Sequence, residues 1–135
     1  KSEFLEFLNL NKLKDKIIFS ENLDPQEKYI KLQNANVFIL PSSYPAEGLP
    51  ISLLEALVNK LPIISTNQGA ITDIVKHDYN GFIINSFNEV EIANYLIKLN
   101  NDKKLFEMMS ENSIKIYEEK FSYEQIKRKT LNEFK

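Results

Sequence analysis

The amino-acid sequence predicts an α/β fold in which helices cover both faces of an open parallel sheet. Short apolar segments rich in Ile, Val and Phe alternate along the chain with longer segments of helical periodicity. The apolar segments show no clean alternation with polar residues, which is typical of strands that are buried on both faces. A strand followed by a helix and a further strand implies crossover connections, and such connections join parallel strands.

Four apolar segments are the predicted strands of this sheet. Each is bounded by Pro, Gly, Asn, Asp or Ser, residues that are common in the turns between elements. The strands are expected at residues 16–19, 36–40, 62–66 and 81–84.

The helices between the strands are predicted from apolar spacing and from capping residues. An opening helix spans residues 4–10. A second helix follows Asp24, because a proline and a Gln/Glu pair come directly after it, as at the start of many helices. The third helix spans residues 50–59 with a proline at its first position, and a short helical turn spans residues 70–76.

Three further helices are predicted to form a tail after the last strand. Their starts are marked by residues that commonly cap helices, namely Ser86 or Asn88, the pair Asn101 and Asp102, and Ser122. The last helix is basic. Its charges between residues 120 and 129 could contact an anionic membrane surface, although a solvated helix face is the favoured interpretation.

Composition excludes several classes of protein. Seventeen Lys and Arg residues against nineteen Asp and Glu residues give a net charge of −2, whereas proteins that bind nucleic acid electrostatically are normally basic. The sequence contains no cysteine and a single histidine, His77. Disulfides, thiolate nucleophiles, most zinc sites and the common hydrolase triads are therefore not expected. His77 itself is predicted to be a surface turn residue.

The length of 135 residues suits one domain, and residues 1–135 are predicted to form one. No apolar run approaches the roughly 20 residues of a membrane-spanning helix, and no signal peptide is recognisable. The chain starts without Met and within a helical pattern, so we expect it to be a fragment of a longer protein.

The loop at residues 41–50 is the first candidate for chemistry. It contains three prolines, one glycine and one carboxylate, and it follows a predicted strand, where open α/β sheets bind ligands. Gly48 allows a ligand to approach the backbone, and the start of the next helix offers unpaired N–H groups to an anion. Glu55 lies about 8 Å along that helix, too far from Glu47 for the two to share a proton. The two glutamates could hold opposite ends of one extended ligand, or could be ordinary capping and solvated residues.

The loop after the third predicted strand is the second candidate. Its polar side chains and its glycine are typical of a phosphate or sugar site, although an ordinary polar turn is the favoured interpretation. The candidate residues are Ser65, Thr66, Asn67 and Gly69.

These segments resemble those of a known family. Residues 41–57, which begin Pro-Ser and continue to EGLPISLLEAL, resemble the E-x7-E motif of the group 1 retaining glycosyltransferases of GT-B architecture. Residues 62–75 resemble the P-V-V-A-T-x-x-G-G-x-x-E-I-V block of that family, and residues 80–84 resemble its N-G-x-L-V strand. Residues 17–20 resemble its V-x-F-x-G strand, so the ordered series covers most of the chain from residue 16 to residue 84.

The resemblance implies that the chain is the Rossmann-like, C-terminal, donor-binding half of a GT-B fold. It implies transfer of a hexose from a nucleotide-sugar, with a UDP-sugar favoured, to a glycan or lipid-linked acceptor with retention of configuration. The acceptor would bind a separate N-terminal domain outside this chain, so the fragment alone is expected to be inactive. A place in polysaccharide biosynthesis is implied, in the cytoplasm or peripheral on the inner face of the membrane. No metal and no cofactor are expected.

The resemblance also implies roles for individual residues. Glu47 would contact the transferred sugar and stabilise charge at the reacting centre. Gly48, Leu49 and Pro50 would line the sugar and the diphosphate with backbone groups. Glu55 would accept hydrogen bonds from the ribose hydroxyls. The nucleotide base is expected near three residues that follow the first predicted strand: Ser20, Glu21 and Asn22.

The chain departs from the family pattern at three positions. Ala70 follows Gly69 in place of a second glycine, Asp73 replaces a glutamate, and Glu21 stands where the family has a glycine. The Arg and Lys that contact the diphosphate in the family precede the first residue of this chain. A non-catalytic Rossmann-like nucleotide- or partner-binding module is the alternative function. A sugar-phosphate enzyme such as an epimerase is a further one, although no nicotinamide-binding glycine fingerprint is visible.

Overall fold

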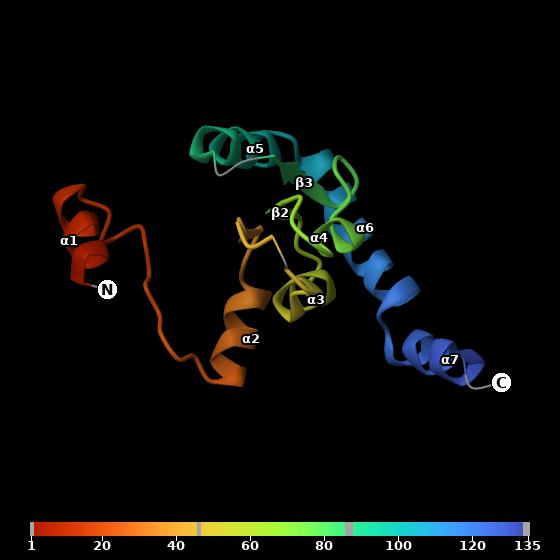
Figure 1. Ribbon diagram of the computed structural model, residues 1–135. Helices are drawn as coiled ribbons and strands as arrows, with labels where there is room; N and C mark the ends of the chain where they lie inside the picture. The colour runs from red at the N-terminus through yellow and green to blue at the C-terminus, as the bar shows by residue number, and fades with distance from the viewer. Residues whose placement is uncertain (1, 46, 86–87, 134–135) are drawn as a thin grey trace. The chain divides into compact units, whose positions relative to one another are not determined.

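The computed structural model describes residues 2–45, 47–85 and 88–133 (Figure 1). In chain order, the elements are α1 (Ser2–Leu10), α2 (Pro25–Gln33), β1 (Phe38–Leu40), α3 (Ile51–Val58), β2 (Ile63–Thr66), α4 (Ile71–Ile74), β3 (Gly81–Ile84), α5 (Glu89–Asn101), α6 (Lys103–Lys120) and α7 (Tyr123–Glu133).

The chain divides into two units, Lys1–Ile30 and Lys31–Lys135. In the first unit, the rings of Phe4 and Phe19 pack with their centroids 5.5 Å apart. Asp24 caps α2, because its Oδ1 accepts hydrogen bonds from the backbone N–H groups of Gln26 and Glu27 at 2.8 and 2.9 Å. The capping predicted from the sequence is therefore confirmed.

The predicted strand at residues 16–19 is wrong. The backbone N–H groups of Lys16 and Ile17 donate back to the carbonyl of Leu13 in a turn, and 84% of Ile18 is exposed. A strand needs a neighbour to take its backbone hydrogen bonds. The described residues of the first unit form no strand, so this segment has no strand partner within its own unit.

The sheet lies in the second unit and has the order β1-β2-β3, with all strands parallel. Ile63 of β2 is in register with Phe38 of β1 and Gly81 of β3. Consecutive strands are neighbours and are joined through α3 and α4, as crossover connections require. The three later predicted strands and the parallel α/β class are confirmed.

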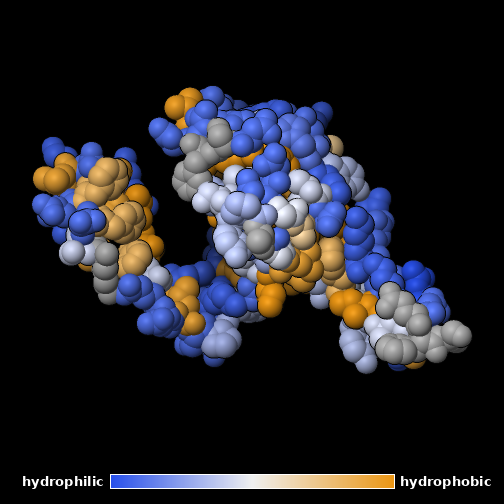
Figure 2. All heavy atoms as spheres, in the orientation of Figure 1, coloured by the Kyte–Doolittle hydropathy of each residue, from blue (hydrophilic) through white to orange (hydrophobic). Residues whose placement is uncertain are grey.

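Adjacent residues of β2 point to opposite faces of the sheet, and both faces are covered. Ile63 packs in a cluster with α3, α4 and Ile116 of α6, whereas Ile64 packs with β3, α5 and Met109 of α6. Helices α3 and α5 accordingly lie on opposite sides of the sheet in Figure 1, and the outer surface over α5 is mainly hydrophilic in Figure 2. Burial on both faces explains why the adjacent residues Ile63 and Ile64 are both apolar.

The predicted helix ends agree closely with the structure. Helix α3 is one residue shorter at each end than predicted, because Pro50 and Asn59 are its caps. Asn88 caps α5 and Asp102 caps α6 through side-chain oxygens that accept backbone N–H groups. Ser122, which precedes α7, donates its hydroxyl to the carbonyl of Glu118 at 3.0 Å. Ser86 lies outside the described residues. No helix in the described part of the chain has the length and apolar character needed to cross a membrane.

Asn80 anchors the turn that leads into β3. Its side chain is buried, and its Oδ1 accepts a hydrogen bond from the backbone N–H of Lys76 at 2.7 Å. Its Nδ2 donates to the carbonyl of Ile74 at 3.3 Å, and its own carbonyl accepts the N–H of Ile63 at 3.1 Å. The amide side chain therefore satisfies backbone groups that would otherwise be buried without a partner.

A cluster of rings lies where α5 covers β3. Tyr95 stacks on Phe82 with centroids 4.0 Å apart, and the His77 ring meets both edge-on. His77 is exposed, as predicted, but it forms an isolated β-bridge with Gly81 just before the turn at residues 78–80, and its Nδ1 accepts the N–H of Ile83 at 3.0 Å. Burial raises the pKa of the Tyr95 phenol, and the carboxylate of Glu91, 3.5 Å from the phenol oxygen, raises it further.

Replacing Asn80 by alanine should lower the free energy of unfolding by about 1–3 kcal/mol, because two buried backbone groups lose their partner. Urea denaturation followed by circular dichroism measures the change. Asn94→Ala, at an exposed position of α5, is the matched control and should stay within about 0.5 kcal/mol of the unmodified chain. Equal stabilities of the two variants would contradict the anchoring role of Asn80.

Tyr95 should make stability fall in alkaline solution. Its pKa is raised in the folded state, so its contribution is complete below the ordinary value of 10.0 and is lost as the pH rises through the folded value. Between about pH 9 and pH 11, the free energy of unfolding should fall more steeply for the unmodified chain than for Tyr95→Phe. Tyr123→Phe, at an exposed position of α7, should follow the unmodified chain. Parallel curves for Tyr95→Phe and the unmodified chain would refute the expectation.

Candidate functional site

Two loops meet at the carboxyl edge of the sheet. One joins β1 to α3 and contains Glu47, and the other joins β2 to α4 and contains Gly69. Because β1 and β2 are adjacent parallel strands, with Leu40 in register with Ser65, both loops leave the sheet at the same edge. This is the edge at which open α/β sheets bind ligands, as the sequence predicts.

Hydroxyl groups at the end of β2 fasten the first loop to the sheet. The Ser65 hydroxyl donates to the carbonyl of Leu40 at 2.6 Å, and the Thr66 hydroxyl donates to the carbonyl of Ser42 at 2.5 Å. Both side chains are buried. The structure therefore places two of the predicted candidates beneath the loops, where their hydroxyl protons bond to the backbone of β1 and of the residues that follow it.

The two loops also touch through their backbones. The N–H of Ala70 donates to the carbonyl of Glu47 at 3.2 Å. Gly69 has a φ of +48°, and a Cβ atom at this position would lie 1.9 Å from the same carbonyl oxygen. Only glycine fits both the conformation and the contact. Asn67, the remaining candidate of the second loop, is exposed.

The carboxylate of Glu47 is held on its own loop. The hydroxyl of Ser42 donates to Oε2 of Glu47, and the oxygen of that hydroxyl accepts the backbone N–H of Tyr44 at 3.2 Å. Glu47 is half-buried, and the hydrogen bond from Ser42 orients its carboxylate. Sequence reasoning gave Ser42 no role, although a serine two residues after a strand and five residues before a glutamate is the available signal.

The segment that follows Glu47 presents its backbone at the start of α3. Gly48 is exposed, and nothing lies within 4 Å of where its Cβ would be. Leu49 is 43% exposed. Pro50 is the N-cap of α3 and makes no side-chain capping hydrogen bond. Glu55 is half-buried in the second turn of that helix. Open backbone therefore adjoins the positive end of the α3 dipole, an arrangement suited to an anionic group.

The three residues expected near a nucleotide base, Ser20, Glu21 and Asn22, belong to the first unit. All three are exposed, and Asn22 has a φ of +50°. Within residues 2–45, 47–85 and 88–133, no group of three or more His, Cys, Asp or Glu side chains is placed to hold a metal ion.

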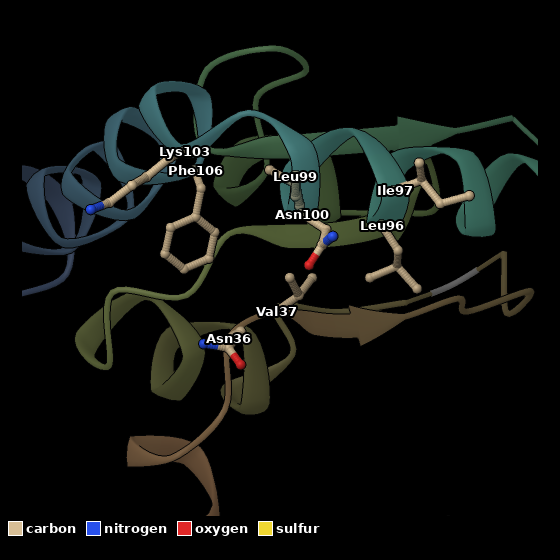
Figure 3. A pocket seen from close by; sticks show the side chains of 8 residues that line it. All are labelled: Asn36, Val37, Leu96, Ile97, Leu99, Asn100, Lys103 and Phe106. Atoms are coloured by element: carbon tan, nitrogen blue, oxygen red, sulfur yellow. The ribbon is translucent and has the colours of Figure 1, made fainter. Parts of the chain in front are cut away.

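A separate cavity of about 680 Å³ lies next to the start of β1, away from these loops (Figure 3). It opens between that strand and the helices α5 and α6. Its lining residues are Asn36, Val37, Leu96, Ile97, Leu99, Asn100, Lys103 and Phe106. None of them belongs to the loops that carry Glu47 and Gly69. The cavity therefore does not coincide with the predicted site residues.

Comparison with known proteins identifies related sequences and folds. Residues 3–116 match the profile of the family described as glycosyl transferases group 1. The chain is 32% identical over 117 residues to the capsular polysaccharide biosynthesis glycosyltransferase CapM of Staphylococcus aureus, which covers 87% of this chain and 30% of CapM. The chain spans about a third or less of the length of the curated relatives that it matches.

Solved structures show the same fold. The C-terminal domain of the group 1 glycosyl transferase LpcC from Francisella tularensis is 25% identical, with a TM-score of 0.79, over 90% of this chain and 62% of that one. HepE of Anabaena in complex with UDP has a TM-score of 0.85 at 18% identity, over 98% of this chain and 36% of that one. The second likeness concerns the fold alone.

Gly69→Ala should lower the free energy of unfolding by about 2–4 kcal/mol, because the new side chain meets the Glu47 carbonyl in a left-handed conformation. Gly48→Ala is the matched control in the neighbouring loop and should change stability by less than about 1 kcal/mol. Chemical denaturation of both variants measures the difference. If the two substitutions cost the same, the contact between the loops does not constrain Gly69.

Proposed function

Because this chain belongs to the group 1 glycosyl transferase family, we propose that it binds the nucleoside diphosphate sugar from which a glycosyltransferase transfers the sugar. A UDP-sugar is the favoured donor, and the name of an Escherichia coli relative that is 37% identical over 82 residues, a UDP-Gal-dependent alpha-1,3-galactosyltransferase, supports this choice. The observation that carries the proposal is the oriented Glu47 carboxylate beside the open backbone of Gly48, at the start of α3.

The donor would lie along the start of α3. Its diphosphate would face the first-turn N–H groups, which the N-cap Pro50 leaves without a side-chain partner, and the helix dipole would favour its charge there. Glu55, in the second turn, would accept hydrogen bonds from the ribose hydroxyls. That Ser20, Glu21 and Asn22 contact the base stays a prediction from the sequence.

Glu47 would act at the sugar. During transfer, the bond between the anomeric carbon and the diphosphate oxygen breaks, a bond from that carbon to the acceptor hydroxyl oxygen forms, and the hydroxyl proton passes to the departing diphosphate. Positive charge grows on the sugar as the diphosphate leaves, and a carboxylate fixed nearby lowers the energy of that state. Gly48, Leu49 and Pro50 would contribute backbone contacts. We propose a glycan or lipid-linked acceptor, held by a further domain, and retention of configuration.

The proposal predicts selective nucleotide binding that depends on Glu55. Ligand-observed NMR titration of this chain with UDP, GDP and ADP should show binding of one of them, with UDP expected. Glu55→Ala should weaken that binding about 10- to 100-fold, the amount expected for hydrogen bonds to a charged group.

Glu119→Ala, at an exposed position of α6, is the matched control and should bind as the unmodified chain does. The absence of binding by all three nucleotides would contradict the proposed function. Unchanged binding by Glu55→Ala would contradict the role given to Glu55 and favour a module that uses this surface differently.

A further inference from the structure

We propose that Ser42 and Thr66 are positioning residues that hold the Glu47 carboxylate in the orientation required to recognise the sugar of the donor. This inference rests on the proposed function, because it assumes that Glu47 faces the sugar. It adds two residues that act through Glu47 and do not themselves contact the donor.

The first step is the hydrogen bond between the two side chains. A serine hydroxyl has one proton to donate, and in Ser42 that proton goes to Oε2 of Glu47. The N–H of Tyr44 donates to the same hydroxyl oxygen at 3.2 Å, so Ser42 is both donor and acceptor within its own loop. These two bonds fix the direction in which the Ser42 hydroxyl points. The hydroxyl therefore holds one oxygen of the Glu47 carboxylate, Oε2.

The second step connects Ser42 to the sheet. The Thr66 hydroxyl donates to the Ser42 carbonyl at 2.5 Å, and Thr66 is only 3% exposed. Strand β2 is buried and lies between β1 and β3, and its last residue, Thr66, is paired with Ile84 of β3, so Thr66 is a firm support. Thr66 therefore fixes the backbone of Ser42, and Ser42 in turn fixes the carboxylate of Glu47.

The third step concerns Glu47 at its other end. The backbone carbonyl of Glu47 accepts the N–H of Ala70 and lies against Gly69. The main chain of Glu47 is thus held by the loop after β2, and its carboxylate is held by Ser42 of the loop after β1. A flexible glutamate side chain loses rotamer freedom when it binds, and here the hydrogen bond from Ser42 restricts that freedom before a ligand arrives.

The predicted consequence is selective for the sugar. Ser42→Ala frees the carboxylate but leaves the start of α3 intact, so it should weaken UDP-sugar binding and spare UDP. We expect the dissociation constant to rise about tenfold for the tightest of UDP-glucose, UDP-galactose and UDP-N-acetylglucosamine. For UDP it should change less than about twofold. Ser42→Thr retains the hydroxyl and should restore sugar binding.

The chain offers a matched control and a second variant. Ser43→Ala removes the neighbouring, exposed hydroxyl of the same loop and should change neither dissociation constant. Thr66→Val removes the hydroxyl bound to Ser42 at nearly constant volume, and it should weaken sugar binding in the same direction as Ser42→Ala. In a Glu47→Gln background, Ser42→Ala should have little further effect, because residues that act through one another are not additive.

A ligand-free measurement completes the experiment. In a chain labelled with ¹³C at glutamate carboxyl groups, Ser42→Ala should shift the Glu47 resonance at neutral pH, and Ser43→Ala should leave it in place. An unmoved Glu47 resonance in Ser42→Ala would overturn the inference whether or not nucleotides bind. Equal weakening of UDP and UDP-sugar by Ser42→Ala would also overturn it, since general loosening of the loop would explain that result. Failure of the unmodified chain to bind UDP contradicts the proposed function separately, and the carboxyl resonance then still decides whether Ser42 holds Glu47.

Discussion

The site depends on the close contact between the Glu47 carbonyl and the loop at Gly69. This contact leaves no room for a side chain at residue 69 and requires a left-handed backbone there. It joins the segment after β1 to the segment after β2, although α3 and β2 lie between them in the sequence. Once the two are joined, the side chain of Glu47, the backbone of Gly48 and the start of α3 have a fixed arrangement.

Negative and partial positive charges alternate along the loop after β1 and the first two turns of α3. The half-buried carboxylates of Glu47 and Glu55 lie on either side of a helix start whose N–H groups carry partial positive charge. A ligand that complements this pattern has an anionic centre and hydroxyl-bearing groups at both ends. A nucleotide-sugar has that order, with a diphosphate between a ribose and a second sugar. The agreement between the two patterns is the physical basis for the proposed function.

Local signals in the sequence predicted most of the fold. Asp24, Asn88 and Asp102 cap their helices as expected, and three of the four predicted strands form, because caps and short apolar runs act over a few residues. The strand at residues 16–19 fails because a strand also needs a neighbour, which composition does not reveal. The sequence also did not reveal the roles of Thr66 and Ser42. Thr66 binds a carbonyl of another segment, and Ser42 reaches Glu47 only because of the course of their shared loop.

The two halves of strand β2 have different roles: the first half stabilises the core, and the second half supports the candidate site. Its first two residues, Ile63 and Ile64, are apolar and join the clusters on the two faces of the sheet. Its last two, Ser65 and Thr66, are equally buried but carry hydroxyls that satisfy carbonyls of the neighbouring segment. A fully apolar strand could pack as well, yet it would leave the loop after β1 without this attachment, because a carbonyl needs a donor to be held in one place. The two buried hydroxyls therefore connect the apolar core to the orientation of Glu47.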